Sequence, residues 1–260
     1  MPMPECIELN IENEIAELWL NRPNALNALS AQLVGEVNDA LAEVERARPR
    51  VFILAGRGER AFCAGADIKE FKPVATTVEA RARHYSRNIF DRIEKLPMPT
   101  IAAVHGYTLG GGLELALCCD MRIAAENARF GFPETGLGTF PGAGGTQRAP
   151  RLIGRSQAMW MIFTGERLNA SDALRMGLVN KVVSTDALMG EVCKIASMIS
   201  ANAPLGVQYA KEAILRGEKV PLEEGIRIET DLNMFMDTTD DYAEAARAFI
   251  EKRKPVFTGR

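Results

Sequence analysis

The chain has 260 residues, 47% hydrophobic and 25% charged, which is typical of a globular protein with one large core, or one core and an appendage. Its 31 basic and 34 acidic residues leave a formal net charge of −3, and the basic residues are scattered, which argues against nucleic acid as a partner. No run of 18 apolar residues occurs, so no membrane association is expected, and the short acidic N-terminus shows no signal or transit peptide.

Apolar and polar residues alternate over 7–20 with a turn at Asn13, which predicts an opening β-hairpin. Residues 29–47 have the spacing of an amphipathic helix that Pro49 follows. Further strands are predicted at 51–55, 101–104, 121–125 and 179–183, and they alternate with helical stretches near 78–95, 111–119 and 155–163. This alternation predicts an α/β fold. The last third is predicted to be all helical, over 186–202, 204–216, 221–237 and 239–252.

An acidic residue among apolar ones marks the segment 110–119, which begins with three glycines. In a helix, Glu114 shares a face with Leu117 and Cys118, so its carboxyl is expected to be desolvated, with a raised pKa that suits proton transfer. The glycines can expose N–H groups at a helix N-terminus to a ligand on which negative charge develops. The alternative is a buried structural glutamate with a hydrogen-bonded partner.

A second acid, Glu134, lies in the segment 130–146, whose six glycines and two prolines exclude a regular helix or central strand. Its aromatic and aliphatic residues indicate a packed loop. By itself Glu134 could be solvated and inert. Together with Glu114 and a backbone donor site, it completes the set of groups that water addition or proton abstraction needs.

The five cysteines show no metal-ligand or redox spacing, so we expect reduced thiols in a cytoplasmic protein, with Cys118 and Cys119 as small core residues. Two histidines, His84 and His105, are too few for a zinc site, and no metal is expected. Residues 56–61 fit the G-x-G-x-x-A dinucleotide pattern. That pattern requires a helix to begin at once, and the residues that follow break helical periodicity. A dinucleotide-binding site is therefore not expected here.

Residues 61–70 carry small side chains at 64–66, directly after the strand predicted at 51–55. Alone this segment is typical of a strand-end turn. Together with the two acid-bearing segments, it resembles the crotonase (enoyl-CoA hydratase/isomerase) superfamily. The resemblance runs the length of the chain through five ordered blocks at 21–29, 62–70, 101–116, 141–148 and 248–255.

The resemblance implies a spiral of ββα repeats with the acyl-CoA site over residues 1–200. A C-terminal helical segment over residues 201–260 would pack trimers, which the family often pairs as dimers of trimers. It also implies an enoyl-CoA hydratase that adds water reversibly across the 2,3-double bond of an acyl-CoA thioester. No cofactor is expected, because CoA is part of the substrate.

The resemblance also implies roles for individual residues, wherever a position of this chain matches a functional position of the family. The N–H groups of Ala66 and Gly111 match the oxyanion hole, which stabilises the enolate of the thioester. Glu114 matches the base toward water and Glu134 the acid that protonates the α-carbon. Gly142 matches a glycine whose N–H helps to place the water.

The CoA moiety is expected against four further residues. Ala64 and Ile68 match positions that line the adenine pocket, and Ala25 and Leu26 lie where the first loop touches CoA. The acyl group is expected along residues 71–90 and 135–140, which indicates a short or medium enoyl chain.

Retention of both acids favours hydration or its reverse, because relatives that shift double bonds typically lack the acid at 114. The alternative is an enoyl-CoA isomerase, or a hydratase or dehydratase for a branched, cyclic or hydroxylated acyl group. A non-catalytic CoA- or RNA-binding role is the remote alternative. The presence of both acids and the absence of a basic patch argue against it.

Overall fold

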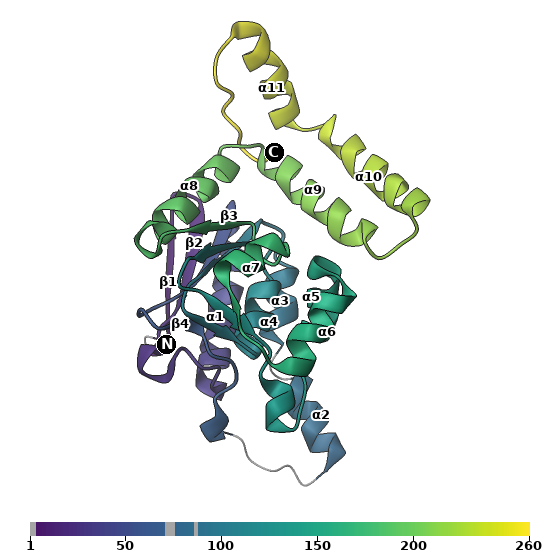
Figure 1. The fold of residues 1–260 in the computed structure, drawn as a ribbon. Coiled ribbons are helices and arrows are strands. Elements are labelled where there is room, and N and C mark those ends of the chain that lie inside the picture. Colours follow the sequence, from purple (N-terminus) through teal and green to yellow (C-terminus); the bar gives the residue numbers. More distant parts are fainter. Residues whose placement is uncertain (1–3, 71–75, 86–87) are drawn as a thin grey trace.

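The computed structural model describes residues 4–70, 76–85 and 88–260, and it shows two β-sheets with their connecting helices and three C-terminal helices that extend from them (Figure 1). The larger sheet has the strand order β1-β2-β3-β5-β7-β10. The bounds of its strands are Ile7–Glu12 (β1), Ile15–Leu20 (β2), Val51–Gly56 (β3), Thr100–Val104 (β5), Met121–Ala125 (β7) and Lys181–Val183 (β10). Strands β1 and β2 form the predicted antiparallel hairpin, and all later neighbours are parallel.

A second, smaller sheet has the order β4-β6-β8-β9. Its strands are Ala61–Cys63 (β4), Tyr107–Leu109 (β6), Arg129–Gly131 (β8) and Leu168–Asn169 (β9). The residue pattern did not predict these strands, because two or three residues are too few to show a period. Each of β3, β5 and β7 is followed closely by a strand of the second sheet and then by helix. The α/β prediction and the implied spiral of ββα repeats are therefore confirmed.

Eight helices precede the C-terminal group in the described part of the chain. They are Ala31–Ala47 (α1), Thr77–Tyr85 (α2), Ile89–Glu94 (α3), Gly111–Leu117 (α4), Gly145–Ile153 (α5), Arg155–Thr164 (α6), Ala170–Arg175 (α7) and Leu188–Ser200 (α8). Short 3₁₀ turns occur at Pro23–Ala25 (η1), Ile68–Glu70 (η2), Glu134–Leu137 (η3) and Thr185–Ala187 (η4).

Helices α1, α4, α6 and α8 agree with the predicted bounds within two residues, whereas α7 was not predicted. Helix α1 starts two residues later than predicted, because the Ser30 hydroxyl caps it by accepting the Leu33 N–H at 3.2 Å. Helix α5 was not predicted, since Gly145 and Pro150 are poor helix formers and its order comes from packing. The stretch predicted at 78–95 is divided between α2 and α3, and residues 86–87 lie outside the described residues.

The last three helices, Pro204–Gly217 (α9), Leu222–Met236 (α10) and Asp240–Glu251 (α11), agree with the sequence within two residues. They extend beyond the sheets (Figure 1). Lys211 of α9 joins them to the body through a 2.7 Å ion pair with Asp120 and a hydrogen bond to the Met98 carbonyl. The buried Asp241 of α11 accepts N–H groups from Thr258 and Gly259, which holds the C-terminal tail. No described helix is long and apolar enough to cross a membrane.

The core lies on both faces of the larger sheet. On β3, Phe52 and Leu54 belong to a large cluster that includes α1, α4 and the second sheet, whereas Val51 and Ile53 belong to a smaller cluster with α8. Such burial of both faces explains the unbroken apolar runs of the parallel strands. Cys118 and Cys119 are buried in the larger cluster, which confirms the prediction of small core residues.

Close packing between α4 and β4 leads to a stability prediction. A Cβ atom on Gly112 would lie 2.0 Å from the Cys63 carbonyl oxygen, and backbone cannot easily yield. We expect Gly112→Ala to lower the free energy of unfolding by about 1–3 kcal/mol or more in urea unfolding. The matched control is Gly35→Ala in α1, where no atom lies within 4 Å of the new Cβ, and stability should rise by about 0.5–1 kcal/mol. Equal stability of the two variants would contradict the prediction.

Candidate active site

Glu114 is held inside the protein at the start of α4. The helix begins after Gly110, whose φ of 52° lies in the left-handed region that favours glycine. Every residue from Gly112 to Leu117 is buried, and Glu114 itself is only 3% exposed. The helical spacing therefore predicted its burial correctly.

One carboxylate oxygen of Glu114 is fixed by the backbone of the glycine-rich loop. Its Oε1 accepts the N–H of Ala143 at 2.7 Å and the N–H of Gly145 at 2.8 Å. Desolvation raises the pKa of Glu114, and these two hydrogen bonds and the charge of Arg148 oppose that rise. The described residues donate no hydrogen bond to Oε2, which leaves that oxygen for a substrate or water.

Glu134 lies in the turn η3. A Cβ atom on Gly110 would lie 2.8 Å from Glu134 Oε1, so this carboxyl lies directly against the residue that precedes α4. Its Oε2 is buried and has no hydrogen-bond partner among the described residues. Burial first, and then the nearby charge of Glu114, raise the pKa of Glu134 to about 7. The two acids predicted from separate segments thus lie at one site.

The N–H groups of Ala66 and Gly111 face the same region. Residue 66 forms a parallel bridge with Leu29, and the flanking Gly65 and Asp67 make its hydrogen bonds, so the Ala66 N–H points away from Leu29. A Cβ atom on Gly111 would lie 3.7 Å from the Ala66 nitrogen. Neither N–H donates to an acceptor in the described chain. Two free backbone donors that lie close together can bind a carbonyl oxygen on which negative charge develops.

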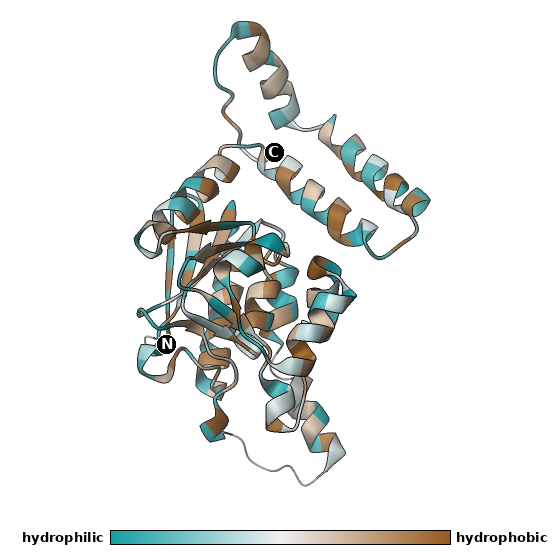
Figure 2. Ribbon diagram, viewed as in Figure 1, coloured by the Kyte–Doolittle hydropathy of each residue, from teal (hydrophilic) through white to brown (hydrophobic). Residues whose placement is uncertain are grey.

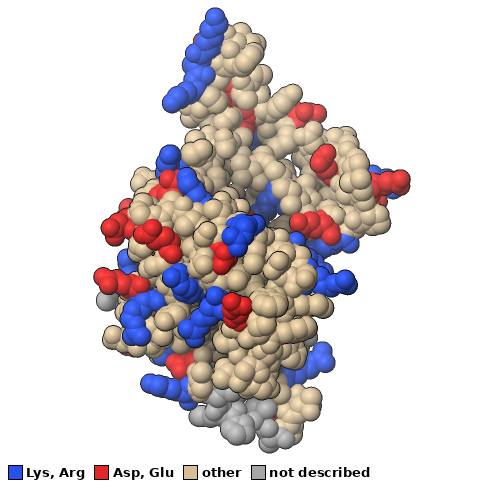
Figure 3. All heavy atoms as spheres, in the orientation of Figure 1, with Lys and Arg blue, Asp and Glu red and all other residues tan. Residues whose placement is uncertain are grey.

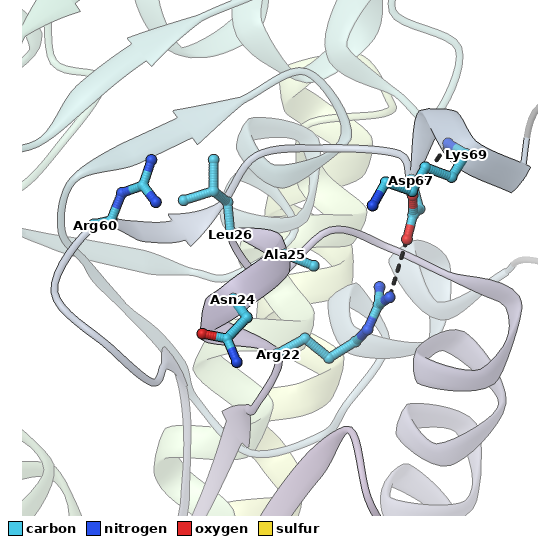
Figure 4. A pocket seen from close by; sticks show the side chains of 7 residues that line it. All are labelled: Arg22, Asn24, Ala25, Leu26, Arg60, Asp67 and Lys69. Atoms are coloured by element: carbon cyan, nitrogen blue, oxygen red, sulfur yellow. Dashed lines mark hydrogen bonds and ion pairs between the residues drawn. The ribbon is translucent and has the colours of Figure 1, made fainter.

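A surface pocket of about 340 Å³ opens beside residue 67 (Figure 4). Ala25 and Leu26, the predicted CoA contacts of the first loop, line it. Its other lining residues are Arg22, Asn24, Arg60, Asp67 and Lys69. Of the other two predicted CoA residues, Ala64 donates its N–H to the Leu26 carbonyl at 3.0 Å and Ile68 is 66% exposed; neither lines this pocket.

The pocket is positively charged overall. Asp67 pairs with Arg22 at 3.0 Å, whereas Arg60 and Lys69 form no ion pair within the described residues (Figure 4). Its chemistry suits an anionic group such as a phosphate. On the larger scale, Figure 3 shows basic and acidic side chains interspersed on the visible face, without a continuous basic patch there.

Of the two stretches expected to shape the acyl pocket, residues 135–140 are fully described. Thr135 donates its hydroxyl to the Ile162 carbonyl at 2.8 Å, which ties η3 to α6. Leu137 and Phe140 are 65% and 64% exposed. The other expected stretch includes residues 71–75 and 86–87, which lie outside the described residues.

The remaining sequence signals have structural explanations. The chain after Gly56 enters β4 rather than a helix, as the rejection of the dinucleotide pattern required. His105 is buried at the end of β5, where burial lowers its pKa. No group of three His, Cys, Asp or Glu in the described chain could hold a metal ion.

The raised pKa of Glu134 predicts a pH-dependent stability. Because the folded state favours the protonated carboxyl, the contribution of Glu134 to the free energy of unfolding should fall as the pH rises from about 4.5 to about 7. Glu134→Gln lacks this titration, so its stability relative to the wild type should rise by on the order of 1–3 kcal/mol between pH 4.5 and pH 8. Urea unfolding at both pH values measures this difference. A pH-independent difference between the two proteins would exclude a raised pKa.

Comparison with known proteins agrees with this geometry. The chain belongs to the family described as enoyl-CoA hydratase/isomerase, whose sequence profile matches residues 10–260. It is 44% identical to the short-chain-enoyl-CoA hydratase of Clostridium acetobutylicum over 95% of both chains. It is 43% identical to the crotonyl-CoA hydratase of Syntrophomonas wolfei, covering 98% of this chain and 99% of the relative.

A crystal structure of enoyl-CoA hydratase from Bacillus anthracis superimposes with a TM-score of 0.93 at 42% identity, covering 98% of this chain and 100% of that one. The predicted superfamily, the fold and the assignment to the enoyl-CoA hydratases are confirmed by these similarities.

The residue pattern missed several groups at the site. Ala143 and Gly145, on either side of Gly144, donate to Glu114, whereas Gly142 stays a predicted water-placing residue. Arg148 and Glu94 form an ion pair behind the same loop. A signal was present for Arg148, since it closes the block 141–148, but nothing in the sequence pairs it with α3.

Proposed function

We propose that this protein hydrates short-chain 2-enoyl-CoA thioesters, with Glu114 and Glu134 as the acid–base pair. The observation that carries the proposal is the meeting of two carboxyls with raised pKa and two unpaired N–H groups at the start of α4. The names of the two bacterial relatives support a short acyl chain.

In the proposed reaction, the thioester carbonyl oxygen accepts the N–H groups of Ala66 and Gly111. Oε2 of Glu114 takes a proton from water as the water oxygen bonds to the β-carbon. The electrons of the double bond move toward the carbonyl, and the resulting enolate is stabilised by the two N–H donors. Glu134, protonated in part near neutral pH, then delivers its proton to the α-carbon.

Atoms balance in this scheme without a cofactor, since water supplies both the hydroxyl and, through the two carboxyls, a proton. Gly142 lies next to Ala143 and is proposed to help place the water through its N–H. Return of the proton from Glu114 to Glu134 by way of solvent restores the starting state.

The pocket beside Asp67 is proposed to take the nucleotide end of CoA. Arg22, Arg60 and Lys69 supply positive charge for phosphates, and Ala25 and Leu26 supply apolar contact. Ala64 and Ile68, on the segment that leads into and out of Ala66, are proposed to complete the adenine contact.

Self-association is part of the proposal. The C-terminal helices include hydrophobic turns, coloured brown in Figure 2, and many of their large apolar side chains are exposed. The most exposed on α9–α11 are Ile214, Leu222, Ile226, Met234, Phe235, Tyr242, Phe249 and Ile250. We propose that residues 1–200 form the core that carries the active site, and that residues 201–260 hold three subunits together as a trimer. Two trimers are proposed to pair into a hexamer. Light scattering after size-exclusion chromatography measures the mass of the assembly. The mass of a monomer would exclude the proposed self-association.

A cytoplasmic location is proposed from the five free cysteines, which a reducing compartment preserves. The enoyl-CoA isomerase alternative is kept because Glu134, with its pKa near 7, could move a proton between carbons without Glu114. A branched, cyclic or hydroxylated acyl group is the other alternative.

The test is hydration of crotonyl-CoA by the purified protein, followed by loss of the conjugated enoyl-thioester absorbance. Rapid loss supports the proposal. Absence of loss, with double-bond migration in a 3-enoyl-CoA, would replace it with the isomerase. A panel of acyl-CoAs in which short linear chains are the poorest substrates would reject the short-chain assignment.

A further inference from the structure

The guanidinium of Arg148 is a buried connection between two helices behind the active site. Its side chain is 14% exposed, and it forms a bidentate pair with Glu94 of α3, in which Nε and Nη2 donate to the two carboxylate oxygens at 2.9 Å each. Nη2 also lies 3.3 Å from Oδ1 of Asp91. The planar fork therefore fixes the orientation of the guanidinium on α5.

The remaining nitrogen of Arg148 holds the loop before α5. Nη1 donates to the Ala143 carbonyl at 3.0 Å. A Cβ atom on Gly144, whose φ is 108°, would lie 1.9 Å from Nη1, so the guanidinium lies directly against this residue. The conformation of residues 143–145 thus depends on where Arg148 is held.

The same three residues hold Glu114. The N–H groups of Ala143 and Gly145 donate to its Oε1, as described above, while the carbonyl of Ala143 accepts from Arg148. A continuous chain of contacts therefore runs from the α3 carboxylates through Arg148 and the loop to the proposed base.

We propose that Arg148 is a positioning residue for the hydration reaction, which acts through residues 143–145 to hold the Glu114 carboxylate in place for attack by water. This proposal rests on the proposed function, in which Glu114 is the base. Arg148 has no contact with the reacting atoms, so it is distinct from the acid–base pair. Lysine cannot replace it fully, because an ammonium group cannot form the planar fork to Glu94 while reaching the loop.

The charged surroundings of Glu114 give the proposal a measurable signature. The titratable and charged groups around it and around Arg148 are Glu134 on η3, Cys118 on α4, Asp91 and Glu94 on α3, and Lys95 and Lys219 near Glu94. Among them, Arg148 is the cation that lowers the pKa of Glu114. Its removal should raise that pKa and move the acid limb of the hydration pH profile to higher pH.

The experiment compares Arg148→Met and Arg148→Lys with Arg151→Met, a matched control whose exposed side chain bonds to Gln147 of the same helix and to no other described residue. With crotonyl-CoA, we expect Arg148→Met to lower kcat at least tenfold, with KM changed by less than threefold and the acid limb shifted upward. Arg148→Lys keeps the positive charge, so the acid limb of the pH profile should stay near its wild-type pH, but only part of the wild-type kcat should be recovered. The control should match the wild type.

A readout without turnover separates this inference from the proposed function. In amide NMR spectra, the N–H resonances of Ala143 and Gly145 should titrate with Glu114 in the wild type and lose their low-field shift in Arg148→Met. Unchanged resonances and a wild-type kcat would overturn the inference. A wild type inactive toward crotonyl-CoA, with the NMR change present, would instead overturn the proposed function.

If Arg148→Met does not fold, Glu94→Gln provides the same test. It keeps the arginine but weakens the bidentate pair that fixes the guanidinium, so kcat should fall severalfold with the same loss of the amide shifts. Wild-type values for Glu94→Gln would reject the role of the pair.

Discussion

Replacement of Glu114 by glutamine is expected to lower kcat for crotonyl-CoA hydration by on the order of a hundredfold or more, with little change in KM. The glutamine carbonyl can still accept the N–H groups of Ala143 and Gly145, so the loop should keep its conformation. An amide cannot take a proton from water, however, and the base is lost. Steady-state kinetics, with thermal unfolding to show that the variant folds, measure the effect.

The control for this variant is Glu12→Gln, an exposed glutamate on β1, which should retain wild-type kinetics. Glu134→Gln should lose a similar factor as Glu114→Gln, and the double variant should lose far less than the product of the two, because the acids act as a unit. Full hydration activity of Glu114→Gln would show that Glu114 is not the base and that Glu134 carries the chemistry alone.

Gly111→Pro is expected to lower kcat by roughly 10²–10³-fold, because it removes one of the two N–H donors to the thioester oxygen. Gly111 is the first residue of α4, where proline is tolerated in helices since that N–H has no partner within the helix. The substitution can therefore remove the donor without breaking the helix. Kinetics with crotonyl-CoA and circular dichroism of the variant test both parts.

The matched control is Gly111→Ala, which keeps the N–H. Its Cβ atom would lie 3.3 Å from Leu29 Cδ1, the end of a flexible side chain, so only a small adjustment is needed. The proline variant should be much slower than the alanine variant. If both show the same kcat, the Gly111 N–H does not stabilise the transition state, and the Ala66 N–H would have to act without it.

Local patterns were sufficient where a single helix or strand determines the outcome. The burial of Glu114 followed from its position one turn before Leu117 and Cys118, and the opening hairpin followed from strict alternation. The C-terminal helices have strong helical periods and agree with their predicted bounds within two residues. The roles of Ala66 and Gly111, in contrast, came only from family resemblance. Every residue except proline has a backbone N–H, so the residue type does not show which N–H groups are free to bind a ligand.

Other features required the folded chain. The strands of the second sheet contain two or three residues and are stabilised by pairing with segments far away in sequence, so local periodicity cannot show them. The order of the 130–146 loop depends on contacts with α4, α5 and α6, and a glycine-rich sequence by itself specifies no single conformation. For this reason the water-placing role of Gly142 was predicted from family resemblance, whereas the hydrogen bonds from Ala143 and Gly145 to Glu114 were seen only in the folded structure.

The sequence by itself determined an α/β chain with a desolvated acid at a glycine-led helix, a second acid in a packed loop, and a helical C-terminal third. Only the tertiary structure decided that Glu134 lies directly against Gly110, the residue that precedes α4, that its pKa is about 7, and that Arg148 connects α3 to the loop around Glu114. The physical reason is the distance along the chain over which each property is determined. Burial and helix formation depend on neighbours three or four residues away, whereas the pKa of a carboxyl depends on every charge and dipole that the fold brings near it.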